Sequence, residues 1–268
     1  MHTRMLKWFK RSLLIAGLTA SAAFADESPE KKGFEIAARS DRSDRGFVNS
    51  EVELKMVLRN RAGRETERSL SLKTLEVPDE QLGDKSVIVF DSPADIEGTA
   101  LLSHAKILDP DDQWLYLPAL KRTKRISSVN KSGPFVGSEF AFEDFTSLEL
   151  NKYDYKFLRT ETLNGLTCDV VERYPKYKYS GYKKQISWID QTDFQVRQVE
   201  FYDRRGDLLK VLTLEDYRKY KDKFWRPHKM LMVNRKTGKS TDFIYSEYDF
   251  DRSLSEREFV KSALNRLR

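Results

Sequence analysis

Cysteine is almost absent from this chain of 268 residues, which holds Cys168 alone. A single cysteine excludes an internal disulfide and any cysteine-rich metal site. Cys168 lies beside Val170 in a predicted strand, where a lone thiol is typically a small core residue and not a nucleophile. Histidine is scarce too, and neither His104 nor His228 has a second ligand at metal-binding spacing. We therefore expect no metal centre and no disulfide.

Motifs of catalysis and of nucleotide binding are also missing. The sequence contains no G-x-S-x-G nucleophile elbow, no P-loop and no G-x-G-x-x-G fingerprint. The cluster of Asp109, Asp111 and Asp112 lacks the glycine and the distal glutamate of a calcium loop, and it fits a turn before a strand better. These absences favour a binding or carrier role over an enzyme, and we expect no cofactor.

Strong net charge is lacking once the N-terminal segment is set apart. Residues 1–25 combine a basic start, an apolar stretch and an Ala23-Phe24-Ala25 cleavage site, which is typical of a cleaved signal peptide. They carry four Lys and Arg and no acid, so the rest of the chain holds 44 basic and 42 acidic residues, a net charge of +2. Nucleic-acid binding needs strong positive charge and is disfavoured. The residue directly after the cleavage site is Asp26 and not the cysteine that lipid attachment needs, so we expect a periplasmic protein without a lipid anchor.

Most of the chain alternates apolar and polar residues with a period of two, which predicts strands with one buried face. The clearest examples are residues 52–58, 69–73, 153–157 and 185–188. Hairpin-type turns stand at residues 61–63, 164–165, 205–207 and 236–238. We expect ten or eleven strands, too many for a flat sheet, in an incomplete antiparallel β-barrel with a few capping helices. Residues 26–268 are expected to form one domain.

Helical patterns are few. Residues 30–39 predict one helix, with Phe34, Ala37 and Ala38 on one side. Residues 256–267 predict a second, with Ser255 as its N-cap. Residues 139–150 are compatible with either a short helix or an aromatic loop.

Two predicted strands, residues 87–90 and 114–117, are apolar on both faces and therefore need cover on both. A C-terminal helix or a crossing loop would supply one cover. The other would be either a ligand or the side chains of the sheet itself.

The block around the second of these strands carries a family resemblance. It reads DQWLYLPALKR at 112–122, KRI at 124–126, FVGSEF at 135–140 and EDF at 143–145. The patterns W-x-Y-x-P-x-x-x-R and G-S-x-[FY]-x-x-E-D resemble those of the outer-membrane lipoprotein-sorting protein family, relatives of the periplasmic lipoprotein carrier LolA. The resemblance extends from about residue 36 to the C-terminus. It implies an incomplete barrel whose helices or loops cap a hydrophobic cavity for acyl chains. It also implies an association with exporters of the resistance-nodulation-division class.

The resemblance and the strand pattern together predict the cavity. In a strand, Trp114 and Tyr116 point to one side while Leu115 and Leu117 point to the other, so one pair can line the cavity while the other meets a cap. A loop framed by glycine and proline follows and can carry aromatic rings over the opening. The predicted cavity and lid residues are Trp114, Leu115, Tyr116, Leu117, Phe135, Val136, Phe140, Phe142 and Phe145. If the loop is a packed crossover, its aromatic residues are ordinary core.

A run of cations follows the strand and is expected near the rim of the cavity, facing lipid phosphates or an acidic partner. It comprises Lys121, Arg122, Lys124 and Arg125 and is completed by Lys131. A solvated edge strand that carries charge against aggregation explains the same residues equally well.

The function that we expect is a carrier that binds acyl chains of a lipoprotein or phospholipid and shuttles them between envelope membranes. Burying about fifteen methylenes at ~0.8 kcal/mol each gives roughly 12 kcal/mol. Association costs about 4–15 kcal/mol, so the net binding is reversible, as a shuttle requires. The alternative is a non-enzymatic accessory subunit that docks on an exporter without carrying lipid.

Overall fold

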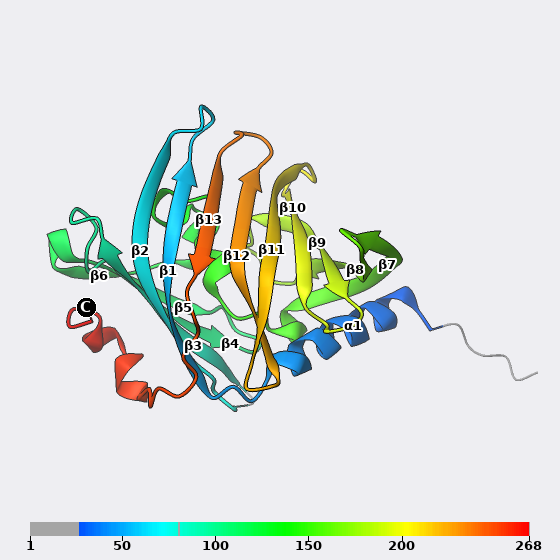
Figure 1. The fold of residues 1–268 in the computed structure, drawn as a ribbon, viewed down its shortest axis with the longest axis horizontal. Coiled ribbons are helices and arrows are strands. Elements are labelled where there is room, and N and C mark those ends of the chain that lie inside the picture. The colour runs from blue at the N-terminus through cyan, green and yellow to red at the C-terminus, as the bar shows by residue number, and fades with distance from the viewer. Residues whose placement is uncertain (1–26, 80, 268) are drawn as a thin grey trace, which may run out of the picture.

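The computed structural model describes residues 27–79 and 81–267, and its core is one sheet of 13 strands (Figure 1). The predicted signal peptide, residues 1–25, lies outside the described residues. The strands are β1 (Asn49–Arg59), β2 (Glu65–Leu75), β3 (Leu82–Ser92), β4 (Ala100–Lys106), β5 (Asp112–Leu117), β6 (Arg122–Arg125), β7 (Tyr153–Leu163), β8 (Leu166–Pro175), β9 (Tyr182–Asp190), β10 (Val196–Asp203), β11 (Leu208–Tyr220), β12 (Phe224–Asn234) and β13 (Ser240–Tyr245). The helix is α1 (Pro29–Asp44), and the short 3-10 turns are η1 (Pro118–Leu120), η2 (Ser128–Asn130), η3 (Phe135–Gly137), η4 (Phe142–Phe145), η5 (Leu150–Lys152), η6 (Glu256–Glu258) and η7 (Lys261–Ala263).

The sheet is antiparallel and open. Its strand order is β6-β5-β4-β3-β2-β1-β13-β12-β11-β10-β9-β8-β7, so β6 and β7 are its two edges. The open, curled, mainly β architecture with few helices confirms the predicted fold class. The strand number, 13 and not ten or eleven, corrects the prediction. Strand β6 shows one reason, because its sequence, Arg-Thr-Lys-Arg, has no apolar alternation to reveal it.

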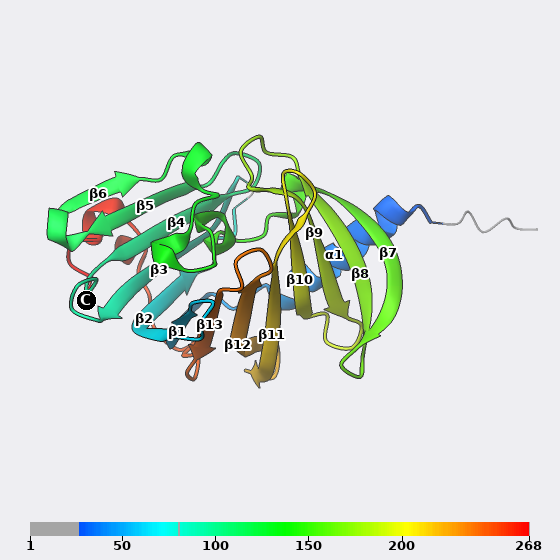
Figure 2. The same cartoon turned by 90° about the horizontal axis from the view of Figure 1, so that it is seen from above.

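The chain between the two edge strands crosses one face of the bent sheet (Figure 2). We call residues 126–152 the covering segment, the face that it crosses the concave face, and the opposite face the convex face. The covering segment lies there because it connects β6, at one edge of the sheet, to β7, at the other.

The predicted hairpin turns are confirmed at all four places. Asn164 and Gly165 join β7 to β8 with φ of 50° and 84°, the left-handed pair that a two-residue hairpin turn requires. Gly63, Gly206 and Gly238 likewise have positive φ between β1 and β2, β10 and β11, and β12 and β13. These turns set the register of the strands that they join.

Helix α1 confirms the predicted first helix and is longer than expected. The side chain of Ser28 caps it by accepting from the Lys31 amide at 3.2 Å. Gly33 lets the helix approach β7, since a Cβ there would lie 2.6 Å from the Phe157 nitrogen. Ile36 and Ala37 pack with Tyr155 in a cluster of their own. The helix therefore covers the end of the sheet near β7.

The prediction of a C-terminal helix at residues 256–267 is wrong. Ser255 does act as a cap, accepting from the Arg257 amide at 3.3 Å, but only the short turns η6 and η7 follow. Between them Val260 is extended, with φ of −116° and ψ of 148°. This break allows Phe259 and Leu264 to become fully buried against the convex face. Packing of two side chains thus overrides helix propensity.

Strand β3 confirms that a strand apolar on both faces is covered on both. Ile88 and Phe90 join the cluster on the concave face, whereas Val87 and Val89 pack with Phe259 on the convex face. The C-terminal residues therefore provide one of the two predicted covers.

The cysteine and the two histidines that we weighed above make contacts within the fold. Cys168 is fully buried, and burial raises the pKa of its thiol to about 11, so it is a small core residue as predicted. His104 lies 2.7 Å from the Phe259 carbonyl oxygen, and the ring nitrogens of His228 contact Tyr220 and Tyr245.

Candidate functional site

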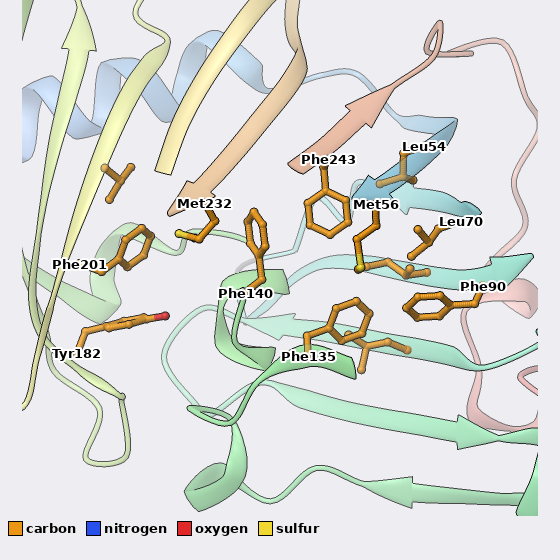
Figure 3. Close-up of a cluster of buried hydrophobic side chains, with 13 residues drawn as sticks. Leu54, Met56, Leu70, Phe90, Phe135, Phe140, Tyr182, Phe201, Met232 and Phe243 are labelled. Carbon is orange, nitrogen blue, oxygen red and sulfur yellow. The ribbon is translucent and has the colours of Figure 1, made fainter. Parts of the chain in front are cut away.

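The concave face carries the largest apolar cluster of the molecule, and the strands and the covering segment both contribute to it (Figure 3). Strands β1 to β4, β9, β10, β12 and β13 supply Leu54, Met56, Leu70, Ile88, Phe90, Leu101, Tyr182, Val199, Phe201, Met232 and Phe243. Phe135 and Phe140 of the covering segment point into the middle of this set. An apolar surface runs across most of the sheet and is closed by a single segment.

Aromatic rings of the covering segment fill the centre of the concave face. Phe135 is fully buried and Phe140 is 4% exposed. The Phe135 ring lies 4.4 Å from that of Phe145 and 5.6 Å from that of Phe90, centroid to centroid. The Phe140 ring lies 4.7 Å from that of Phe243. The segment therefore packs as part of the core in this structure.

A buried ion pair fastens the covering segment to the second half of the sheet. The Asp144 carboxylate accepts from the Lys210 ammonium at 2.7 Å and from the Tyr182 hydroxyl at 2.8 Å. It also accepts from the Ala141 amide within the segment, while Lys210 donates to the Glu139 carbonyl at 2.9 Å. Because the two charged side chains are 4% and 8% exposed, their interaction is weakly screened.

Glu143 makes a second attachment, to the chain just before β9. Its carboxylate accepts from the Gly181 amide at 2.8 Å and from the Ser180 hydroxyl at 2.9 Å. Burial, reinforced by the neighbouring Asp144 charge, raises the pKa of Glu143 to about 7. The Glu-Asp pair of the sequence motif is thus the anchor of the covering segment.

Side chains from the first half of the sheet hold the segment by hydrogen bonds to its backbone carbonyls. The Arg68 guanidinium donates to the Val136 carbonyl, and the Gln113 side chain donates to the Phe142 carbonyl at 2.8 Å. Val136 has a φ of 44° and Gly137 of 77°, so the chain reverses in the left-handed region. For a β-branched residue such as Val136, this conformation is strained.

Two cavities remain beside the covering segment. One, of about 370 Å³, is mainly apolar and lies between the segment and β5; its walls include Ile96, Leu115, Leu117, Val136 and Phe142. The other, of about 420 Å³, is more polar and lies toward β9 to β11; its walls include Glu139, Phe140, Tyr182, Arg204 and Lys210. Both volumes lie within the range of roughly 300–1,000 Å³ that is usual for ligand pockets.

The structure divides the residues predicted from β5 between the two faces. Leu115 packs against the concave cluster and lines the apolar cavity together with Leu117. Trp114 and Tyr116 pack on the convex face with the C-terminal residues. The predicted lid residues Phe135, Val136, Phe140, Phe142 and Phe145 all belong to, or pack against, the concave cluster.

The predicted cations lie on the edge strand β6 and immediately before it. Lys121, Arg122, Lys124 and Arg125 are exposed, and Arg125 forms an ion pair with Asp112. Lys131 corrects the prediction, since it is 8% exposed and its ammonium donates to the Asp111 carbonyl. Its position inside the covering segment turns it inward, away from the rim.

Sequence reasoning missed the partners of the Glu-Asp anchor. Ser180, Gly181, Tyr182 and Lys210 come from β9, β11 and the chain before β9. No spacing rule connects them to residues 143–144, because only the folded sheet brings them together. An inward lysine in the otherwise apolar start of β11 was the one available signal.

Among residues 27–79 and 81–267, no three histidine, cysteine or acidic side chains gather as metal ligands. Over the same residues, no helix has the length and apolar character needed to cross a bilayer.

Comparisons with known proteins identify the family. A family model described only as that of an uncharacterised protein matches residues 83–266. No curated protein sequence matches the chain. A crystal structure of a domain named for outer-membrane lipoprotein sorting, from Vibrio parahaemolyticus, is 48% identical, with a TM-score of 0.85, and the match covers 88% of this chain and 99% of that one.

Two further structures extend the comparison. A DUF1329 family protein from Desulfovibrio piger is 30% identical over 89% of this chain and 100% of its own, with a TM-score of 0.83. A LolA superfamily protein from Nitrosomonas europaea, 21% identical over 85% of this chain and 97% of its own, shares the fold with a TM-score of 0.67. The chain therefore belongs to the DUF1329-type family of outer-membrane lipoprotein-sorting proteins.

Proposed function

We propose that this protein is a periplasmic carrier that binds the acyl chains of a lipoprotein or lipid at its concave face and moves them between envelope membranes. The naming of a 48% identical relative for lipoprotein sorting supports this function. The role is one of binding, with no chemical step.

The continuous apolar concave face under a separate covering segment is the observation that carries the proposal. Leu115 and Leu117 line the apolar cavity together with Val136 and Phe142 of the covering segment. The Phe142 ring in the wall of this cavity lies 5.7 Å from the Phe135 ring, centroid to centroid, so an acyl chain bound there is next to the concave cluster. We propose that the chain advances by displacing the rings of the covering segment.

Displacement makes the exchange nearly balanced in free energy. Each methylene that leaves water contributes about 0.8 kcal/mol, and each phenyl ring that leaves the core forfeits about 1.5–3 kcal/mol. The rings of Phe135, Phe140 and Phe145 thus offset a large part of the gain from the cargo. Release then needs little work, which suits a carrier.

The test is to purify the protein without detergent, extract it with organic solvent and identify bound lipids by mass spectrometry. In parallel, displacement of a fluorescent fatty acid measures affinity. Leu115→Gln places an amide in the apolar cavity and should weaken binding about tenfold, since burying an unpaired amide costs about 1–3 kcal/mol. Leu254→Gln, on the convex face, is the matched control and should bind as the wild type does. An empty cavity together with no displacement would rule the carrier function out.

One observation favours a second function. Aromatic rings of the covering segment already fill the centre of the concave face, which suits an accessory subunit that carries no lipid. Its exposed cations, Lys121, Arg122 and Lys124, would then dock on an exporter of the resistance-nodulation-division class. Crosslinking from Lys121 or Lys124 to such an exporter, with no lipid recovered, would favour this function over the carrier.

A further inference from the structure

Positive charge is concentrated at one end of an almost neutral molecule. Residues 113–138 contain five Lys and Arg and no acid, and residues 259–267 contain two and no acid. The fold brings these two segments together, because the C-terminal residues pack on the convex face of β3 to β5 beside the β6 edge (Figure 2). The remainder of the chain after residue 25 is therefore net negative.

A depression of about 780 Å³ lies where the two acid-free segments meet. Lys121 and Lys261 supply its cations, and Thr123, Ser262 and Asn265 supply hydroxyl and amide groups. Its apolar walls are Tyr116 and Pro118, and no acidic residue lines it. A pocket with this lining is suited to an anion that accepts several hydrogen bonds.

The cations of the depression are free to bind a ligand. Within residues 27–79 and 81–267, no carboxylate forms an ion pair with Lys121 or Lys261, although 26 ion pairs occur there. Both lysines are exposed. Lys121 adopts a left-handed conformation, with φ of 47°, at the turn between η1 and β6. Other lysines of the described chain also lack an ion pair, but these two line one depression that has no acidic residue in its walls.

Strand register shows that the depression is part of a wider cationic edge. Thr123 pairs with Tyr116 and Arg125 with Trp114, so their side chains share the convex face with the C-terminal residues. Arg122 and Lys124 alternate to the other face. Leu120, 55% exposed, lies immediately before Lys121. Cations thus surround the edge on both sides, with an exposed leucine at its end.

We propose that this edge docks on a membrane surface and that the depression binds the phosphate of an anionic phospholipid headgroup. Polybasic surfaces are attracted to anionic leaflets, with about 1 kcal/mol contributed per cation, or roughly a fivefold gain in affinity. An exposed leucine and a tyrosine complement the interface between headgroups and acyl chains. The exposed Leu120 would add less affinity for a folded acidic protein, whose surface offers charge and not acyl chains. The inference rests on the proposed function in one respect: a carrier must contact the membranes between which it moves lipid.

Vesicle co-sedimentation tests the inference. The purified protein is mixed with vesicles of phosphatidylglycerol and phosphatidylcholine, and separately with phosphatidylcholine alone. The wild type should bind the anionic vesicles and not the neutral ones, and binding should weaken as salt rises. Lys121→Glu/Lys261→Glu should lower the affinity roughly tenfold or more, since two attractive charges become repulsive.

The control is Arg235→Glu/Lys239→Glu, which makes the same change in net charge. These two residues are exposed at the β12–β13 turn and form no ion pair among the described residues. This variant should lose less than about threefold in affinity, because distant charges are screened. Equal losses in the two variants would overturn the site, since net charge alone would then explain binding.

Two other outcomes are decisive. Failure of the wild type to bind anionic vesicles at low salt overturns the inference and leaves an acidic protein as the partner of the edge. The fatty-acid displacement assay tests the carrier function separately from the docking surface. The Lys121→Glu/Lys261→Glu variant should bind the fluorescent fatty acid as tightly as the wild type does. If the wild type binds the fatty acid but not the anionic vesicles, only the docking surface is contradicted. If it binds the vesicles but not the fatty acid, only the carrier function is contradicted.

Discussion

At the residue scale, the Asp144–Lys210 ion pair is one of the contacts that join the covering segment to the sheet. A surface ion pair would contribute little, since its charges remain solvated. This pair is buried between the covering segment and the sheet, and each partner has further hydrogen bonds to backbone or hydroxyl groups. Buried pairs of this kind matter most when one partner is removed, because the other charge is then left without compensation.

Replacing Asp144 by asparagine should therefore destabilise the protein by about 3–5 kcal/mol, since it leaves the Lys210 ammonium buried and unpaired. Urea unfolding measures the loss. Asp154→Asn is the control, because the Asp154 side chain is 74% exposed and its nearest ion-pair distance is 3.9 Å, so a change below about 0.5 kcal/mol is expected. A loss below about 1 kcal/mol for Asp144→Asn would contradict the anchoring role.

Glu143 gives the attachment a dependence on pH. Its pKa of about 7 exceeds the ordinary value of 4.5, so the folded protein holds this proton more tightly than the unfolded chain does. The stability of the folded state should therefore fall as pH rises from about 4.5 to about 7. Glu149, with a pKa raised to about 7, and Asp84, raised to about 6, act in the same direction.

Replacing Glu143 by glutamine should flatten this dependence, because the variant has no proton to lose there. The free energy of unfolding, measured by urea unfolding from pH 5 to pH 8, should decline less steeply in the variant. The decline between the two ends of the range should be smaller by on the order of 2 kcal/mol. If the wild type and the variant have parallel profiles, Glu143 does not titrate in this range.

At the element scale, the strands were predictable because their information is local. Alternation along β1 and β2 and the glycine of each hairpin turn fix both strand and register without reference to the rest of the chain. Strand β3 went further, since apolar residues on both of its faces required two covers, and both are present.

The remaining elements depend on contacts that the sequence does not display locally. Residues 256–267 have helical periodicity, yet the burial of Phe259 and Leu264 breaks the helix into two turns. The pattern of β5 separated Trp114 from Leu115 correctly but could not say which face is concave. That choice depends on how the whole sheet bends. Lys210, the partner of Asp144, lies 66 residues away.

At the scale of the whole molecule, an open sheet with 13 strands has a large apolar face that must be covered by something. Here the covering segment does this with its own rings, and helix α1 and the C-terminal residues cover other areas. The concave face therefore has two possible occupants, the covering segment and a cargo. If they compete, the ligand stabilises whichever state exposes the face.

Competition predicts a specific response to truncating a ring of the covering segment. Phe140→Ala removes a side chain that is 4% exposed from the concave cluster and should cost about 3–5 kcal/mol in the absence of ligand. A fatty acid should bind this variant about tenfold more tightly than the wild type, because it no longer displaces that ring, and should restore much of the lost melting temperature. Phe259→Ala is the matched control, since Phe259 is fully buried in the cluster on the convex face. It should lose similar stability and gain no additional rescue from the fatty acid. Equal rescue of both variants, or of neither, would mean that the covering segment and the cargo do not share the concave face.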